Sequence, residues 1–132
     1  KAIIMETLIT NGIKVSAEPF YQESYSKPLE MKFVFAYRIT IENLGTETAQ
    51  LLRRHWHIVE ATGIAREVEG EGVVGQQPVL EPGAKHQYVS WCPIPTEIGK
   101  MFGVFLFQRK SDGANFEVQI PEFQLLAPFK QN

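Results

Sequence analysis

The stretch Gly70–Gly75 carries the spacing GxGxxG, which in dinucleotide-binding proteins follows a strand and opens a helix. In this chain Pro78 follows the third glycine closely, and the pair Pro82-Gly83 comes soon after it. Proline lacks a backbone N–H and clashes with the preceding helical turn, and Pro-Gly marks a turn, so no helix fits here. The sequence therefore argues against a nucleotide cradle and predicts a glycine-rich bend or bulge between strands.

Apolar and polar residues alternate with a period of two along much of the chain. The clearest case has Phe35, Tyr37 and Ile39 on one parity and Arg38 and Thr40 on the other. This period predicts a half-buried strand, and β-branched and aromatic residues suit its pleated surface. Further strands are predicted over residues 13–17, 48–60, 85–92, 99–110 and 116–120. A short segment over 65–69 precedes the glycine stretch, and a last apolar piece over 123–127 lies along a sheet edge.

Turn signals separate these segments, and no long stretch has a clear helical period. The signals are Asn11-Gly12, Asn43-Leu44-Gly45, Thr62-Gly63 and Ser111-Asp112-Gly113. Seven or so short strands joined in this way predict an all-β antiparallel sandwich. The strand over 99–110 is expected to be the most buried, because apolar residues occupy both of its parities.

Strict alternation assigns two faces to the strand over residues 48–60. Trp56 is its predicted core residue. Leu52, Arg54 and Ile58 share the face of Trp56, whereas Leu51, Arg53, His55 and His57 occupy the other face.

Length and composition are those of an ordinary globular domain. The 132 residues predict a single domain over 1–132, with a flexible or irregular segment over 1–8. A formal charge of −2 argues against a nucleic-acid partner, and the apolar run at residues 2–5 is too short to insert into a membrane. The single cysteine, Cys92, excludes an internal disulfide framework and favours a cytoplasmic location.

Several separated segments together resemble the ApaG family over most of the chain. They are GIKV (12–15), FAYRITIENLG (35–45), QLLRRHW (50–56), EVEGEGVVGQQP (67–78), LEPG (80–83), YVS (88–90), GKMFG (99–103) and IPEF (120–123). The resemblance implies an immunoglobulin-like or fibronectin type III-like sandwich of about seven or more strands, bacterial and cytosolic, with no established catalytic activity. It also implies a link to cobalt and magnesium resistance or efflux. Versions of the domain attached to F-box proteins imply a role in protein recognition.

His55 and His57 are two residues apart on a predicted strand, so both imidazoles project from one face within reach of a shared metal ion. A metal site needs further ligands, and His86, Glu60 or Cys92 cannot be placed beside them from the sequence. The alternative is that both histidines are solvated or packed without a ligand. His57 stands where the family typically has an aliphatic residue.

The glycine stretch is also a candidate anion-binding loop, in which successive N–H groups converge on a phosphate or pyrophosphate. The residues of this hypothesis are Gly70, Gly72, Gly75, Arg53, Arg54 and Arg66. Glutamates at 67, 69 and 71 oppose it, because they bring negative charge to the same place. The alternative is that arginines and glutamates pair across neighbouring strands.

The function expected from these observations is a non-enzymatic binding module with a protein partner and no cofactor. Cys92 lacks a recognisable catalytic setting, and the carboxylates form no acid–base pair. Exposed sheet edges make a homo-oligomer plausible. The alternative is a small-ligand sensor for a divalent cation or a phosphate compound. The expected interaction surface comprises Arg54, Glu71, Gln76 and Gln77, and Gly72→Glu and Arg54→Glu are expected to abolish it without disturbing the fold.

Overall fold

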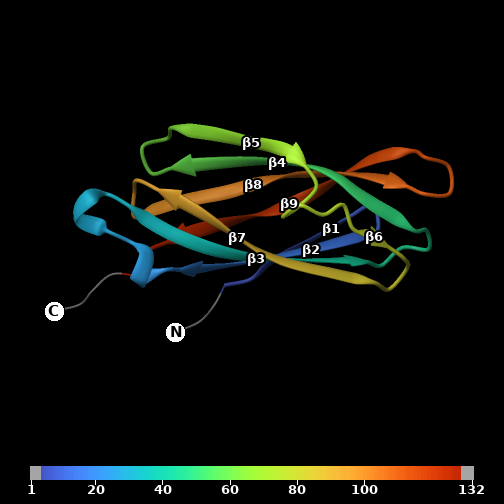
Figure 1. The fold of residues 1–132 in the computed structure, drawn as a ribbon, viewed down its shortest axis with the longest axis horizontal. Coiled ribbons are helices and arrows are strands. Elements are labelled where there is room, and N and C mark those ends of the chain that lie inside the picture. Colours follow the sequence, from blue (N-terminus) through green and yellow to red (C-terminus); the bar gives the residue numbers. More distant parts are fainter. Residues whose placement is uncertain (1–3, 129–132) are drawn as a thin grey trace.

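The computed structural model describes residues 4–128 as two antiparallel β-sheets stacked face to face (Figure 1). This confirms the predicted all-β sandwich of the immunoglobulin-like or fibronectin type III-like kind. One sheet has the strand order β1-β2-β3-β7, and the other has β5-β4-β8-β9 with β6 also paired to β4. The elements are β1 (Glu6–Thr10), β2 (Ile13–Tyr21), the 3-10 turns η1 (Glu23–Tyr25) and η2 (Pro28–Glu30), β3 (Phe33–Asn43), β4 (Ala49–Glu60), β5 (Ala65–Glu71), β6 (Val79–Leu80), β7 (Lys85–Ile94), β8 (Ile98–Arg109) and β9 (Asn115–Leu126).

The first strand begins earlier than the sequence predicted. β1 starts at Glu6 and pairs with β2 through a turn at Asn11-Gly12, where both residues have positive φ. Asn-Gly favours this kind of two-residue hairpin turn. The irregular segment predicted over 1–8 is therefore wrong for residues 6–8, and residues 1–3 lie outside the described part of the chain.

The core lies between the two sheets and is built from the alternate residues of each strand. Trp56 is 2% exposed and makes edge-to-face contacts with Tyr37, at 5.3 Å between ring centroids, and Phe123, at 5.9 Å. Its predicted core position is confirmed. β8 is buried on one face only, because Phe102 and Val104 are half-exposed on the outer face of the sandwich. The prediction that this strand is the most buried one is wrong, because β3 is buried on both faces over residues 33–37.

A bulge at Leu52 divides β4 into two parts of opposite parity. The pairing of β4 with β8 is regular up to Leu51 and resumes at Arg53, which leaves Leu52 unpaired. Leu51 is consequently fully buried with Trp56, although strict alternation assigned the two residues to opposite faces. A β-bulge adds one residue to one strand and reverses the facing of everything beyond it.

The sheets approach each other along β1 and β9. Nδ2 of Asn11 donates a hydrogen bond to the Glu117 carbonyl at 3.0 Å, and the Gln119 amide donates to the Thr10 hydroxyl at 3.3 Å. β9 is an edge strand, as expected for residues 123–127, but it runs without interruption from Asn115 to Leu126. Within residues 4–128, no helix has the length and apolar character needed to cross a membrane.

Candidate functional site

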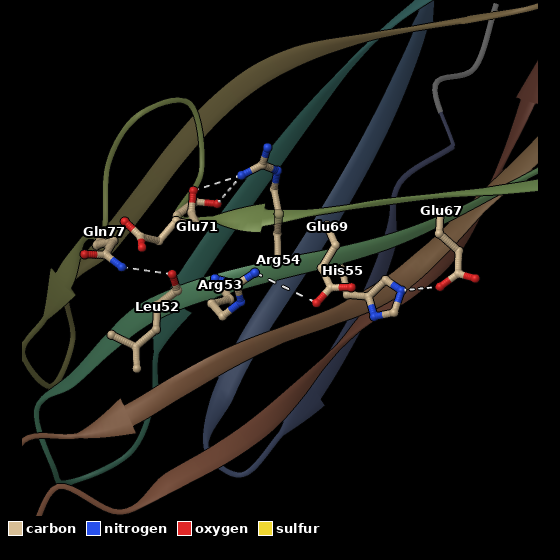
Figure 2. A network of polar contacts seen from close by, with 9 residues as sticks. Leu52, Arg53, Arg54, His55, Glu67, Glu69, Glu71 and Gln77 are labelled. Carbon is tan, nitrogen blue, oxygen red and sulfur yellow. Dashed lines mark hydrogen bonds and ion pairs between the residues drawn. The ribbon is translucent and has the colours of Figure 1, made fainter.

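The two faces of the β4–β5 hairpin carry the side chains that the sequence singled out (Figure 2). β4 and β5 are antiparallel, with Arg53 opposite Glu71 and His57 opposite Glu67. On the outer face of the sandwich, an Arg53 Nη2 lies 3.8 Å from an oxygen of Glu69. Cross-strand pairing of arginine and glutamate, expected as the alternative to an anion site, is therefore present for Arg53.

The outer face also brings together three potential metal ligands. Nε2 of His55 lies 2.6 Å from Oε1 of Glu67, and the rings of His55 and His57 stack with centroids 4.7 Å apart. One ligand atom from each of His55, His57 and Glu67 lies within 4.8 Å of the others. This cluster does not include His86, Glu60 or Cys92, which the sequence could not place beside the two histidines.

Sequence reasoning missed Glu67, although a usable signal was present. The turn at Thr62-Gly63 joins β4 to β5. Residues at equal distances along the chain before and after Thr62 face each other in the hairpin, and this register pairs His57 with Glu67. An antiparallel hairpin places directly paired residues on the same face, so register alone brings this carboxylate beside the two imidazoles.

The glycine stretch forms a tight turn. Val73 and Gln76 exchange both backbone hydrogen bonds, at 2.8 and 3.0 Å. The two residues between them, Val74 and Gly75, have φ of 46° and 76°. Positive φ at both central positions is the pattern of a type I′ hairpin turn. The predicted bend between strands is confirmed.

Three amides of this turn are already occupied. Gly72 N–H donates to the Leu52 carbonyl at 2.8 Å, while the N–H groups of Val73 and Gln76 donate to each other's carbonyls. An anion nest needs such N–H groups to converge on the ligand. The geometry therefore gives the phosphate hypothesis little support at Gly72, Val73 and Gln76.

The three arginines of the anion hypothesis point to three different places. Arg53 lies on the outer face with Glu69. Nη1 of Arg54 donates to the carbonyls of Glu71, at 2.9 Å, and Gly72, at 3.0 Å. Nη2 of Arg66 donates to the Pro93 carbonyl of β7 at 2.6 Å. The carbonyl of the bulged residue Leu52 also holds the glycine turn in place. It accepts from Gln77 Nε2 at 3.0 Å (Figure 2) and from the Gly72 N–H at 2.8 Å.

Gly70 and Gly72 both lie in close packing, Gly70 against Arg54 and Gly72 against Gln76. A Cβ at Gly70 would lie 3.1 Å from the Arg54 guanidinium, which crosses the strand at that point. A Cβ at Gly72 would lie 2.3 Å from the Gln76 carbonyl oxygen. By contrast, nothing lies within 4 Å of a Cβ at Gly75, where only the positive φ favours glycine. Gly70 thus leaves room for the Arg54 guanidinium, Gly72 is required both by space and by its φ of 65°, and Gly75 is required by its φ alone.

Comparison with known proteins agrees with this architecture. The ApaG domain profile matches residues 23–109. The chain is 49% identical over 124 residues to Protein ApaG of Brucella suis biovar 1, covering 94% of this chain and 95% of that protein. This chain belongs to the ApaG family. It is also 51% identical to Protein ApaG of Brucella anthropi over the same number of residues, again covering 94% and 95% of the two chains. The crystal structure of the putative ApaA protein from Bordetella pertussis superposes with a TM-score of 0.86 at 43% identity, covering 89% of this chain and 95% of that one.

Cys92 of this ApaG-family domain is shielded at the junction of β7 and β5. Its side chain is 2% exposed, and burial raises the pKa of the thiol, with Arg66 opposing that rise by a smaller amount. Nη2 of Arg66 lies 3.6 Å from the sulfur. Nearby, burial raises the pKa of both Tyr37 and Tyr88. A buried thiol with a raised pKa is a poor nucleophile.

We expect Cys92 to react with a thiol reagent at least about a hundredfold more slowly in the folded domain than in denaturant. The reason is that both access and thiolate formation are suppressed in the folded state. Reaction with a chromogenic disulfide, followed by absorbance in both states, measures this ratio. Rapid labelling of the folded protein would contradict the assignment of Cys92 to the core.

Val74 of the type I′ turn is expected to be a strained position. Its φ of 46° is unfavourable for a β-branched residue, whereas Asn-Gly is the preferred dipeptide of this turn. Val74→Asn should therefore raise the free energy of unfolding by about 1 kcal/mol, measured by urea denaturation. Val79→Asn is the matched control, because Val79 is similarly exposed but lies in the extended strand β6. Equal effects of the two substitutions would show that backbone strain at Val74 is absent.

Proposed function

We propose that this ApaG-family domain is a non-enzymatic binding module whose Val73–Gln76 turn recognises another protein. The observation that carries the proposal is the state of Val74, which is 62% exposed and held at φ 46°. A left-handed conformation costs about 1–2 kcal/mol for a residue with a Cβ. Strained residues cluster at sites of recognition, where the surrounding structure imposes them. An exposed apolar side chain held in this state is suited to contact a partner.

The turn is supported in a way that suits recognition. Val73 is buried at 1% exposure, the Arg54 guanidinium holds the carbonyls before the turn, and Gln50 Nε2 donates to the Gln77 carbonyl at 3.0 Å. A loop that is already fixed loses little conformational entropy when it binds. The rigid sandwich thus presents Val74 on a preorganised loop, which is a common arrangement for binding sites.

This geometry refines the interaction surface expected from the sequence. Glu71 and Gln76 are exposed beside Val74 and are suitable contact residues. Gln77 directs its side-chain amide to Leu52, and Arg54 holds the turn from within, so we propose that both support the surface instead of forming its contacts.

Self-association through sheet edges stays a prediction, and the charges disfavour one of the edges. β5 is an edge strand whose outward side chains are Glu67, Glu69 and Glu71. Two copies paired through β5 would bring these carboxylates together, and charged side chains are a common protection of sheet edges. A cytoplasmic location and a role in cobalt or magnesium resistance, both implied by the family resemblance, also stay predictions.

Photo-crosslinking tests the proposed protein-recognition surface. Benzoylphenylalanine is placed at Gln76, which is exposed beside Val74, and as a control at Ser111 in the β8–β9 turn. After irradiation in native cell extract, we expect position 76 to give a discrete adduct that position 111 does not give. Adding Val74→Asn to the Gln76 probe should remove the adduct while the fold is retained.

The outcomes separate recognition from incidental contact. An adduct at position 76 that competes with unlabelled wild-type domain, and not with the Val74→Asn domain, supports the proposal. The same bands from both positions, or an adduct insensitive to Val74→Asn, would refute a recognition role for this turn. Circular dichroism and urea denaturation establish that each variant is folded.

A further inference from the structure

Two imidazoles and a carboxylate meet on the outer face of the β4–β5 hairpin, apart from the Val73–Gln76 turn. His55 and His57 project from alternate positions of β4, and Glu67 projects from the facing position of β5. Their potential ligand atoms lie within 4.8 Å of one another. In a tetrahedral zinc site with bonds of about 2.0–2.1 Å, neighbouring ligand atoms lie about 3.4 Å apart. Side-chain adjustments of about 1 Å would therefore let all three atoms contact one ion.

The pairing of β4 with β5, together with a ring of β8, positions the two imidazoles and the carboxylate. Direct register fixes Glu67 opposite His57, and the hydrogen bond of 2.6 Å brings the same carboxylate to His55. The ring of His57 is also stacked on Phe102 of β8, with centroids 5.0 Å apart and planes inclined by 11°. Two of the three side chains are thus held by ring packing and backbone pairing. The side chain of Glu67 is 61% exposed, so its carboxylate has room to turn from His55 toward an ion.

The local charge and the donor types define which ion would fit. Glu69 and Glu71 follow Glu67 at alternate positions of β5, and Arg53 lies beside Glu69 on this face. This concentration of carboxylates attracts a cation. Two imidazoles with one carboxylate form a donor set typical of zinc with an open position for water, whereas magnesium and calcium prefer oxygen ligands alone.

We propose that His55, His57 and Glu67 bind one zinc-class divalent ion, with water as the remaining ligand. The ion would join β4 to the exposed edge strand β5 and replace the His55–Glu67 hydrogen bond with coordinate bonds. This site does not depend on a role for Val74 in protein recognition.

Calorimetric titration of the tag-free, chelator-treated domain with zinc chloride tests the site. We expect one ion per chain, and a melting temperature raised by about 5–10 °C when free zinc is a hundredfold above its Kd. His57→Ala should weaken affinity more than about a hundredfold, and Glu67→Gln about tenfold or more. His86→Ala is the matched control, since His86 lies on β7 in the other sheet and should leave binding unchanged. Magnesium chloride should give no heat.

Each result bears on the proposal. Failure of the folded wild-type domain to take up zinc would overturn it. Uptake that survives His57→Ala, or that is lost in His86→Ala, would place the ion elsewhere and would overturn it as well. Should His57→Ala fail to fold, Glu67→Gln decides the question, because it removes only the charge of an exposed carboxylate. Unchanged affinity in Glu67→Gln would then exclude this ligand set.

Discussion

Gly103→Ala is expected to destabilise the domain by about 3–5 kcal/mol, a large fraction of the stability of a domain of this size. Gly103 lies in β8 directly opposite Trp56 of β4. A Cβ at this position would lie 2.1 Å from the His55 carbonyl oxygen and 3.1 Å from Trp56 Cα. Both atoms belong to the backbone of a central strand, so relief requires the strand pair to separate. That separation would loosen hydrogen bonds of the ladder and the packing of Trp56.

Urea denaturation followed by tryptophan fluorescence measures this effect. The control is Lys100→Ala on the same strand, whose amine lies 3.7 Å from Glu122 in a largely exposed ion pair and should change stability by less than about 1 kcal/mol. A Gly103→Ala domain as stable as the Lys100→Ala domain would mean that β4 and β8 are not packed as described.

Gly72→Ala is the second substitution with a large expected effect, about 3 kcal/mol of destabilisation. One contribution is the left-handed conformation, because φ is 65° and an added Cβ costs about 1–2 kcal/mol there. The other is the overlap of the new Cβ with the Gln76 carbonyl oxygen at 2.3 Å, which would open the Val73–Gln76 turn. We expect the adduct at position 76 to be lost with it.

Gly75→Ala provides the matched control in the same turn. Its φ of 76° is similar, yet nothing lies within 4 Å of the position that its new Cβ would occupy, so only the conformational cost of about 1–2 kcal/mol applies. Urea denaturation of both variants isolates the steric part as their difference. Equal destabilisation would show that the close approach of Gln76 to Gly72 carries no cost.

These geometries correct the two variants that the sequence suggested as harmless surface probes. Gly72→Glu adds the same overlapping Cβ together with a charge, so it cannot leave the turn intact. Arg54→Glu would place a carboxylate against the carbonyls of Glu71 and Gly72, which accept hydrogen bonds from the guanidinium. Loss of binding in either variant would report damage to the loop. Val74→Asn avoids this difficulty, because its expected effect on stability has the opposite sign to its expected effect on binding.

The local pattern of residue types was sufficient to predict the fold class and to reject a nucleotide-binding site. A period of two needs only a pleated strand with one buried face, and Pro78 with Pro82-Gly83 prevents a helix without reference to any distant residue. The hairpin signals at Asn11-Gly12 and Asp112-Gly113 act over two residues for the same reason.

Tertiary structure alone decided which residues of β4 face the core and which residues form the candidate sites. The bulge at Leu52 frees a carbonyl that accepts hydrogen bonds from Gly72 and Gln77, which lie far along the chain. The same bulge turns Leu51 to the core side of the strand, opposite to the side that strict alternation assigned to it. Arg54 likewise binds backbone carbonyls, which no side-chain pattern encodes. Periodicity records the local choice between buried and exposed, whereas bulges, register and backbone acceptors depend on which distant strands pair.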